Sequence, residues 1–261
     1  MAELIFLGTG AADWTMENKV PGKEFRRNSA ALLDRKLMLD CGGLGGAYIL
    51  DFREDFGDKT LYDDVTDILI THNHGDHVDA GTVRKLADEH PRHVWCDKAV
   101  SEQIGEHPNI TYTLLKPFQE VVCGAYRVMP ILANHDIVAD GENFAFHYII
   151  ETPDSKKLLY ATDGAWFLRP SWQEMKQHKF DLAVLDCTVG DFHDWRVFEH
   201  NTIPMLREMV QEMNNVEMMN ENGKIIATHL ARTLHEPHEV TAEILKKFGM
   251  ETAYDGLKVL F

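Results

Sequence analysis

The residues best suited to chemistry stand close together in the segment Thr71–His77, which reads T-H-N-H-G-D-H. The segment holds three imidazoles and one carboxylate, those of His72, His74, His77 and Asp76. Such groups suit Zn²⁺ or a similar divalent ion. They could not converge from a helix, where neighbouring residues point to different sides, but they can converge from a tight turn. A polar, His-rich loop that faces water is the alternative interpretation.

Three further candidate ligands follow apolar runs elsewhere in the chain. His135 comes after the run at 126–133, Asp163 after 158–161 and His229 after 225–227, just as Thr71–His77 comes after 65–70. If these runs are buried strands, all seven groups lie at strand ends, where the ligand sites of layered α/β folds gather. An isolated aspartate after a strand is most often a helix N-cap, and an isolated histidine there is most often a loop residue. Together, the seven groups could hold two metal ions, with one carboxylate between them.

The elements that must position these loops form a mixed pattern of strands and helices. We expect strands at 4–7, 30–33, 37–40, 65–70, 93–96, 110–115, 120–123, 126–133, 144–151, 157–161, 182–185, 224–228 and 257–260. We expect helices from Cys41–Gly43 to about Asp51, and at 80–89, 101–106, 166–178 (after Pro170), 201–214 and 237–248. Turns are expected at Asp34–Lys36, at Gly124, at Asp140–Gly141 and at Pro153–Asp154. Two sheets packed between helices, in one domain over residues 1–261, would satisfy this pattern.

Composition narrows the classes of function. The 42 acidic and 26 basic residues give a formal charge of −16, which argues against an extended nucleic-acid surface or a surface for anionic membranes. An anionic small substrate remains compatible, because bound dications dominate the field of a site. The four cysteines form no C-x-x-C pair, and no run reaches the length of a membrane span. Without a recognisable signal peptide, we expect a soluble protein of the reducing cytoplasm.

The order H-x-H-x-D-H, then a lone His, Asp and His, resembles the metallo-β-lactamase superfamily. The resemblance implies an α/β (α+β) fold, a four-layer αβ/βα sandwich of two mixed sheets flanked by helices. It also implies two divalent ions per chain, with zinc expected and manganese or iron as alternatives. By this resemblance, one ion is held by His72, His74 and His135. The other is held by Asp76, His77 and His229, and Asp163 bridges the two.

Within the superfamily, Phe6–Gly10 resembles the opening of the phosphodiesterase branch. The closer likeness is to the phosphoribosyl cyclic phosphodiesterases of carbon–phosphorus lyase pathways. It is carried by Arg26–Ser29, Leu185–Thr188, His200–Thr202, Ile226–His229 and Tyr254–Gly256. Those enzymes have a cysteine cluster near the N-terminus for a separate zinc, whereas residues 11–28 contain no cysteine. The resemblance therefore extends to the group, and a shared substrate does not follow.

These features predict a dinuclear hydrolase that cleaves a small cyclic phosphate or nucleotide-like diester with a metal-bridging hydroxide. We expect Asp76 to orient the nucleophile and His200 to protonate the departing oxygen, although His200 could instead simply precede a helix. Weaker candidates for substrate contact are Arg26, Arg27, Arg169 and His193, the first two being equally compatible with a solvated loop. Asp40, Thr71 and Thr228 are expected to hold the ligands by hydrogen bonds.

Three other functions fit parts of this pattern. A carboxylic ester or lactone hydrolase could use the same ions. A nuclease that processes tRNA 3′ ends fits less well, because the charge is negative and no Gly- and Lys-rich arm is present. A binding module without activity would be expected to have lost ligands. As partners we expect a small phosphorylated molecule and, on general grounds, a second copy of the chain.

Overall fold

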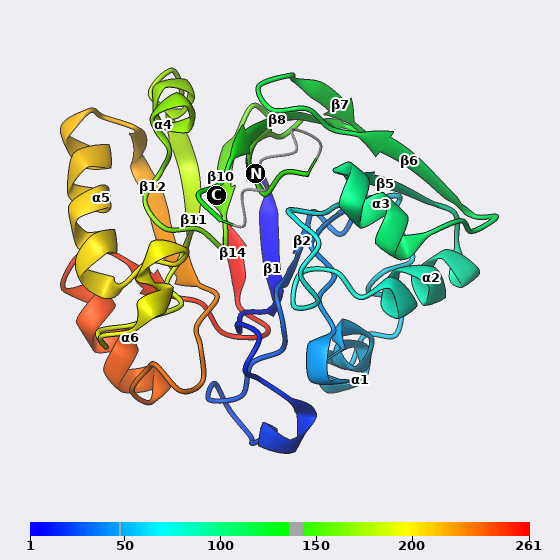
Figure 1. Cartoon of the computed structure of the whole chain (residues 1–261), viewed down its shortest axis with the longest axis horizontal. Helices are drawn as coiled ribbons and strands as arrows, with labels where there is room; N and C mark the ends of the chain where they lie inside the picture. Colours follow the sequence, from blue (N-terminus) through cyan, green and yellow to red (C-terminus); the bar gives the residue numbers. More distant parts are fainter. Residues whose placement is uncertain (47, 136–142) are drawn as a thin grey trace.

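The structure is a computed structural model that describes residues 1–46, 48–135 and 143–261 (Figure 1). In these residues two seven-stranded sheets face each other. The first sheet has the order β14-β1-β2-β3-β4-β5-β6. Its strands are β1 (Glu3–Gly8), β2 (Ala30–Leu33), β3 (Leu37–Leu39), β4 (Asp67–Leu69), β5 (Arg92–Cys96), β6 (Ile110–Leu114) and β14 (Lys258–Leu260). Pairing is antiparallel from β14 to β3 and parallel from β3 to β6.

The second sheet has the order β13-β12-β11-β10-β9-β8-β7. Its strands are β7 (Val121–Cys123), β8 (Tyr126–Leu132), β9 (Phe146–Glu151), β10 (Lys157–Ala161), β11 (Phe180–Asp186), β12 (Met219–Thr228) and β13 (Glu251–Thr252). Here β13 to β10 run parallel, and β10 to β7 run antiparallel. The two sheets thus share one plan, in which a parallel half continues into an antiparallel half.

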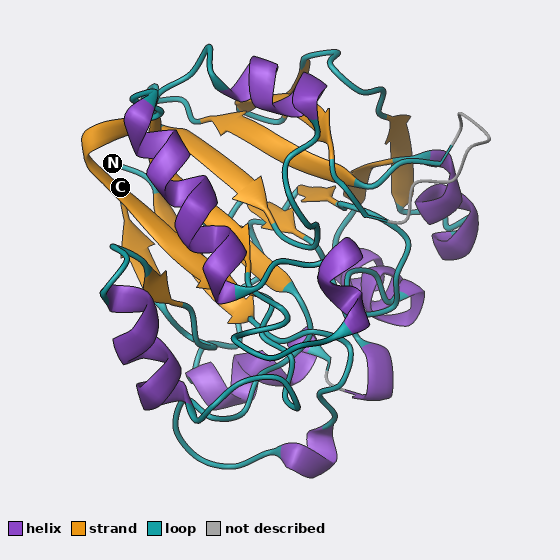
Figure 2. Ribbon diagram, turned by 60° about the vertical axis from the view of Figure 1, so that its left-hand side comes forward, coloured by secondary structure: helices purple, strands orange, loops and turns teal. Residues whose placement is uncertain are grey.

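Helices cover the outer face of each sheet, which gives the four layers seen in Figures 1 and 2. Against the first sheet pack α1 (Phe52–Phe56), α2 (Ala80–Glu89) and α3 (Lys98–Ile104). Against the second pack α4 (Arg169–Met175), α5 (Ile203–Asn215) and α6 (His238–Lys246). The 3-10 helices are η1 (Met16–Asn18), η2 (Leu44–Gly46), η3 (Ile49–Asp51) and η4 (Trp195–Phe198). Among the described residues, none of the helices has the length and apolar composition needed to cross a membrane.

Alternation along the strands explains the layers. In β1, Leu4 and Phe6 join the core between the sheets, whereas Ile5 and Leu7 join the core under the helices. Burying both faces of a strand in this way stabilises the sandwich by about 25 cal/mol for each Å² of apolar surface removed from water. The two ends of the chain meet at one edge, because Ala2 and Phe261 exchange backbone hydrogen bonds of 3.1 Å.

Direct hydrogen bonds also join the two sheets beside the segment Thr71–His77. The hydroxyl of Tyr148 in β9 donates to the carbonyl of Ile70, directly after β4. The amide of Phe146, also in β9, donates to the carbonyl of Thr71 at 2.9 Å. The second sheet therefore holds the backbone of the first sheet where the candidate ligands begin.

The four-layer α/β sandwich predicted from the sequence is confirmed, and most expected elements form within a few residues of their predicted bounds. The hairpin turn is formed by Asp34 and Arg35, whose φ angles of 49° and 56° suit the twist of the flanking strands. The short strand β13 was not predicted. The turn expected at Asp140–Gly141 lies outside the described residues.

The helix expected from Cys41–Gly43 to Asp51 is wrong. Cys41 is instead bonded to the ligand segment, its amide donating to His77 at 2.7 Å and its carbonyl accepting from Asp79 at 2.8 Å. At Gly42 the backbone passes so close that an added Cβ would lie 2.0 Å from the carbonyl oxygen of Asp76. These contacts keep Cys41 and Gly42 out of a helix, and among the described residues between Cys41 and α1 the helical turns are the short η2 and η3.

Candidate metal centre

The seven predicted ligands converge from four loops, and each loop follows a strand. His72, His74, Asp76 and His77 follow β4; His135 follows β8; Asp163 follows β10; His229 follows β12. Asp163 and His229 both adopt a φ of 59°, which is uncommon for residues other than glycine and recurs at functional sites. The backbone therefore turns sharply at these two positions and directs both side chains to one point.

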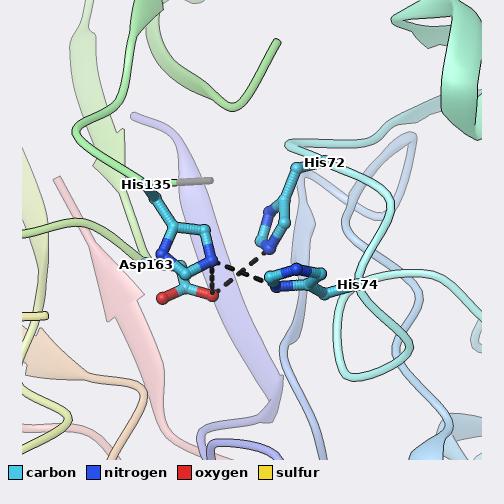
Figure 3. Close-up of side chains that lie close together, drawn as sticks. All are labelled: His72, His74, His135 and Asp163. Atoms are coloured by element: carbon cyan, nitrogen blue, oxygen red, sulfur yellow. Dashed lines mark hydrogen bonds and ion pairs between the residues drawn. The ribbon is translucent and has the colours of Figure 1, made fainter. Parts of the chain in front are cut away.

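The carboxylate of Asp163 lies at the centre of the cluster, as Figure 3 shows for three of its neighbours. Its Oδ2 atom is 3.1 Å from Nε2 of His77, 3.3 Å from Nε2 of His72 and 3.4 Å from Nε2 of His135. Nε2 of His229 is 3.8 Å away. One carboxylate oxygen thus faces four imidazole nitrogens, an arrangement suited to a ligand shared between two ions.

In the described part of the chain, three groups of potential ligands contain Asp163, and two of them consist of predicted ligands alone; the third joins Asp163 and His229 to Asp186 and His200. The first contains His72, His74, His135 and Asp163, and the second contains Asp76, His77, Asp163 and His229. In the first, Nδ1 of His74 approaches Nε2 of His135 at 3.1 Å. In the second, Nε2 of His229 lies 3.1 Å from Nε2 of His77 and 3.2 Å from Oδ2 of Asp76. Each group offers the nitrogen and oxygen donors of a zinc-type site.

Hydrogen bonds at the far side of the rings select which nitrogen faces the centre. Nδ1 of His77 lies 2.9 Å from Asp40, and the Thr71 hydroxyl donates to the same carboxylate at 2.9 Å. That hydroxyl also lies 3.1 Å from Nδ1 of His72. Nδ1 of His229 lies 2.7 Å from the hydroxyl of Thr188. With their Nδ1 atoms engaged, these rings direct Nε2 to the cluster.

Buried polar atoms without hydrogen bonds test whether a metal ion fits. Among the described residues, Nε2 of His72, Oδ1 of Asp163 and Nδ1 of His200 are buried and make no hydrogen bond of acceptable geometry, although Nδ1 of His200 lies 2.6 Å from Oδ1 of Asp163. An unsatisfied buried polar atom costs about 1–3 kcal/mol, so native proteins rarely keep one without a function. The orphaned atoms of His72 and Asp163 belong to the first ligand group, and the donor set therefore fits divalent ions.

The buried histidines and carboxylates of the cluster shift one another's pKa values. Burial alone would lower the pKa of His77, but Asp40, Asp163 and Asp76 raise it to about 10. Burial and the neighbouring His77 lower the pKa of His72 well below its usual value. Burial opposes ionisation of Asp163, yet His135, His200 and His229 hold the pKa of that carboxyl well below its usual range. The carboxylates are therefore ionised and attract positive charge.

A cavity of about 300 Å³ opens at the cluster. Five candidate ligands line it, namely His74, Asp76, His135, Asp163 and His229. His200 also lines it, and its Nδ1 lies 2.6 Å from Oδ1 of Asp163 and 3.8 Å from Oδ2 of Asp186. The remaining lining residues are Ala11, Ala12, Asp13, Thr188, Trp195, Arg196, Glu199 and Ala231.

Four residues predicted to contact substrate lie elsewhere, so we no longer assign them to it. Arg26 is buried and donates to the Thr9 hydroxyl and the Ala253 carbonyl, both at 2.7 Å. Arg27 is also buried and pairs with Asp55 and Asp255. Arg169 lines a separate hollow near α4 and α5, and His193 is exposed without lining the cavity.

Thr228 likewise does not hold a ligand as predicted. Its carbonyl accepts from the Cys187 amide at 2.9 Å, while the hydroxyl beside His229 is that of Thr188. In the turn at Gly8–Gly10, the hydrogen-bond donors of Thr9 are satisfied within the chain, because its amide and its hydroxyl both donate to Asp255.

Sequence reasoning missed three supporting residues. Asp186 accepts hydrogen bonds from the hydroxyl and amide of Thr188 and from the amide of Asn201. The Asn201 side chain donates to the Gly164 carbonyl at 2.7 Å and accepts from the Trp166 amide at 3.1 Å, which holds the loop of Asp163. Two signals were available: Asp186 and Thr188 directly end an apolar run, as the ligands do, and all three residues lie in segments that carry the family resemblance, Leu185–Thr188 and His200–Thr202.

Comparisons with known proteins agree with this geometry. A family model described as a Beta-lactamase superfamily domain matches residues 50–230. YhfI from Bacillus subtilis, a metallo-beta-lactamase fold protein, is 15% identical with a TM-score of 0.72, and all of both chains is covered. A diphosphatase from the PhnP family is 19% identical with a TM-score of 0.71, covering 100% of this chain and 97% of the other.

Zn²⁺-bound PqqB from Methylobacterium extorquens is 13% identical with a TM-score of 0.74, covering 99% of this chain and 100% of the other. At these identities the likeness shows the fold alone. Among curated proteins, none matches the sequence.

Proposed function

Because the chain belongs to the beta-lactamase superfamily and is a metal-dependent hydrolase of that superfamily, we propose that it hydrolyses a small phosphodiester. The preferred substrate is a cyclic phosphate or a nucleotide-like diester. The observation that carries this proposal is the presence of His200 in the same cavity as the two ligand groups. A phosphodiester needs a proton donor for its departing alkoxide, and His200 supplies one beside the ligands.

The proposed metal assignment follows the two groups of ligands. His72, His74 and His135 would hold one divalent ion, Asp76, His77 and His229 would hold a second, and Asp163 would serve both. Zinc suits this donor set, and manganese or iron are alternatives. Bound ions supply a water of lowered pKa and stabilise the charge of the phosphoryl oxygens.

The chain's own residues then perform two tasks. Asp76 lines the cavity, and its carboxylate orients the attacking water through a hydrogen bond. His200 keeps Nδ1 beside Asp163, which leaves Nε2 to give its proton to the departing oxygen. Burial opposes protonation of His200, but Asp163 and Asp186 raise its pKa, in keeping with an acid.

The likeness to solved structures and the net charge of the chain support a small phosphodiester over the other candidate substrates. One structure with this fold is a diphosphatase and another is yeast PDE1, 13% identical with a TM-score of 0.70. Human tRNase Z shares the fold as well, at 16% identity and a TM-score of 0.66. A tRNA body would, however, meet a chain with a formal charge of −16.

The test is to assay zinc- or manganese-loaded protein with bis-p-nitrophenyl phosphate and with a panel of lactones. We expect turnover of the diester. Lactone hydrolysis without any diester turnover under either metal would instead establish the ester or lactone alternative.

His200→Asn extends the test to the proton donor. It should lower kcat by roughly 10²- to 10⁴-fold for a diester with an alkoxide leaving group. The loss should be much smaller for p-nitrophenolate, which departs without a proton. His193→Asn is the matched control, since that exposed histidine does not line the cavity. Equal losses for both leaving groups would remove His200 from this role.

A further inference from the structure

Three large aromatic side chains are exposed beside the metal cavity. Phe192 is 43% exposed, Trp195 70% and Phe198 79%, all within seven residues of one segment. Exposed aromatic groups at the rim of a cavity mark binding surfaces, because leaving them in water forgoes the free energy of burial. Of the three, Trp195 lines the cavity that also contains His200 and the candidate ligands.

The segment around Trp195 is firmly anchored. Val197 packs on the small cluster of Ala11, Val189, Ala231 and Leu234. The amides of Glu199 and His200 both donate to the carbonyl of Arg196, at 2.9 and 2.8 Å. These contacts fix the backbone between Trp195 and His200, so the indole extends into the cavity wall from an anchored segment.

The chemistry of the cavity wall indicates what Trp195 contacts. Apart from Trp195, the apolar lining consists of Ala11, Ala12 and Ala231, whose small side chains leave room for a flat group. Arg196 is the one arginine or lysine among the described lining residues, and Asp194 already binds it at 2.7 and 2.9 Å. Asp13 and Glu199 add negative charge. The wall therefore repels a second phosphate and suits an uncharged ring.

We propose that Trp195 determines specificity by stacking on the nucleobase of the substrate, so that the cyclic phosphate hydrolysed is a nucleoside derivative and not a bare sugar phosphate. This inference rests on the proposed phosphodiesterase function. In the reaction, water adds across one P–O bond of the ring, the released sugar oxygen takes a proton, and a monoester remains. Trp195 takes no part in that bond change and contributes binding only.

A matched pair of substrates tests the inference. Adenosine 2′,3′-cyclic phosphate and methyl riboside 2′,3′-cyclic phosphate share the leaving oxygen and differ only in the base. Wild-type protein loaded with zinc or manganese should prefer the nucleoside. Trp195→Ala should lower the ratio of the two kcat/KM values roughly five- to hundredfold, the range of base–aromatic stacking, through a higher KM for the nucleoside. Trp195→Phe should keep most of the preference.

Phe198→Ala is the matched control, because it removes an equally exposed ring of η4 that does not line the cavity. It should leave the ratio as in the wild type. As a readout independent of turnover, adenosine 3′-monophosphate should quench the intrinsic tryptophan fluorescence of the wild type but not that of Trp195→Phe.

The outcomes separate this inference from the function on which it rests. Failure of the wild type to hydrolyse either substrate, or bis-p-nitrophenyl phosphate, would overturn the phosphodiesterase function and this inference with it. Turnover of both substrates without preference for the base would overturn the inference alone. The same follows if Trp195→Ala changes the oligomeric state and leaves the ratio unaltered, since Trp195 would then serve contact between copies.

Discussion

His72, His77 and His229 each have a neighbour that fixes the orientation of the ring. Among these neighbours the hydroxyl of Thr188 constrains its ligand most, because it lies 2.7 Å from Nδ1 of His229 and donates its own proton to Asp186. With its proton committed, the Thr188 oxygen accepts from Nδ1–H of His229, and Nε2 of that ring is left facing the cluster. An imidazole held in this way is both correctly oriented and more basic toward a metal.

Thr188→Val should therefore weaken metal binding while preserving side-chain shape. We expect a 10- to 100-fold loss of zinc affinity, roughly the effect of removing a hydrogen-bond partner of a ligand. Competition with a chromogenic chelator measures it. Thr228→Val is the control, since that buried threonine lies beside His229 in sequence but does not hold its ring. Equal losses in the two variants would show that the Thr188 hydroxyl has no special role.

The convergence of the seven candidate ligands could be predicted from sequence, and so could the supports Asp40 and Thr71, whereas the support Thr188 could not, for a physical reason. His72 to His77, His135, Asp163 and His229 each stand directly after an apolar run, so that residue type and strand end coincide. Thr188 reaches His229 only because β11 and β12 pair in parallel, with Asp186 opposite Thr228. That register arises from packing between distant segments, and no local pattern records it.

At the scale of elements, the alternation of apolar residues predicts strands well, and contacts between elements decide the rest. The wrong helix at 41–51 illustrates this, because its four glycines disfavour a helix and contacts with the neighbouring ligand segment hold Cys41 and Gly42 in another conformation. Strand β13, only two residues long, forms because it pairs with β12. The contact between β9 and the residues after β4 is of the same kind and holds the ligand segment in place.

Tyr148→Phe tests that contact between the sheets. It leaves the buried carbonyl of Ile70 without its donor, which should cost about 1–3 kcal/mol of unfolding free energy. Urea denaturation measures the change. Tyr126→Phe is matched to it, because Tyr126 of β8 also donates to the first sheet, but to the partly exposed carboxylate of Asp34 at 3.0 Å. Water can replace that donor, so Tyr126→Phe should lose less unfolding free energy than Tyr148→Phe. A smaller loss in Tyr148→Phe than in Tyr126→Phe would contradict this account.

At the scale of the whole molecule, the candidate metal centre joins the two sheets. One ligand segment follows β4 of the first sheet, and the other three ligands follow β8, β10 and β12 of the second. Bound ions would therefore tie both halves of the sandwich together at one edge. Without them, Asp76 and Asp163 lie buried as carboxylates among histidines that hold the pKa of both carboxyls below the usual range.

Metal removal should consequently lower global stability as well as activity. A ligand at 100 times its Kd stabilises the folded state by about 2.7 kcal/mol per site. For a chain of this size each kcal/mol moves Tm by roughly 2–4 °C, so two occupied sites should raise Tm by roughly 10–20 °C. Calorimetry after dialysis against a chelator, and again after zinc is restored, measures the shift. Asp163→Asn should lose most of it, because both ligand groups share that residue, whereas Asp154→Asn, at an exposed turn, should retain it. An unchanged Tm on chelation and reconstitution would show that no metal links the two sheets.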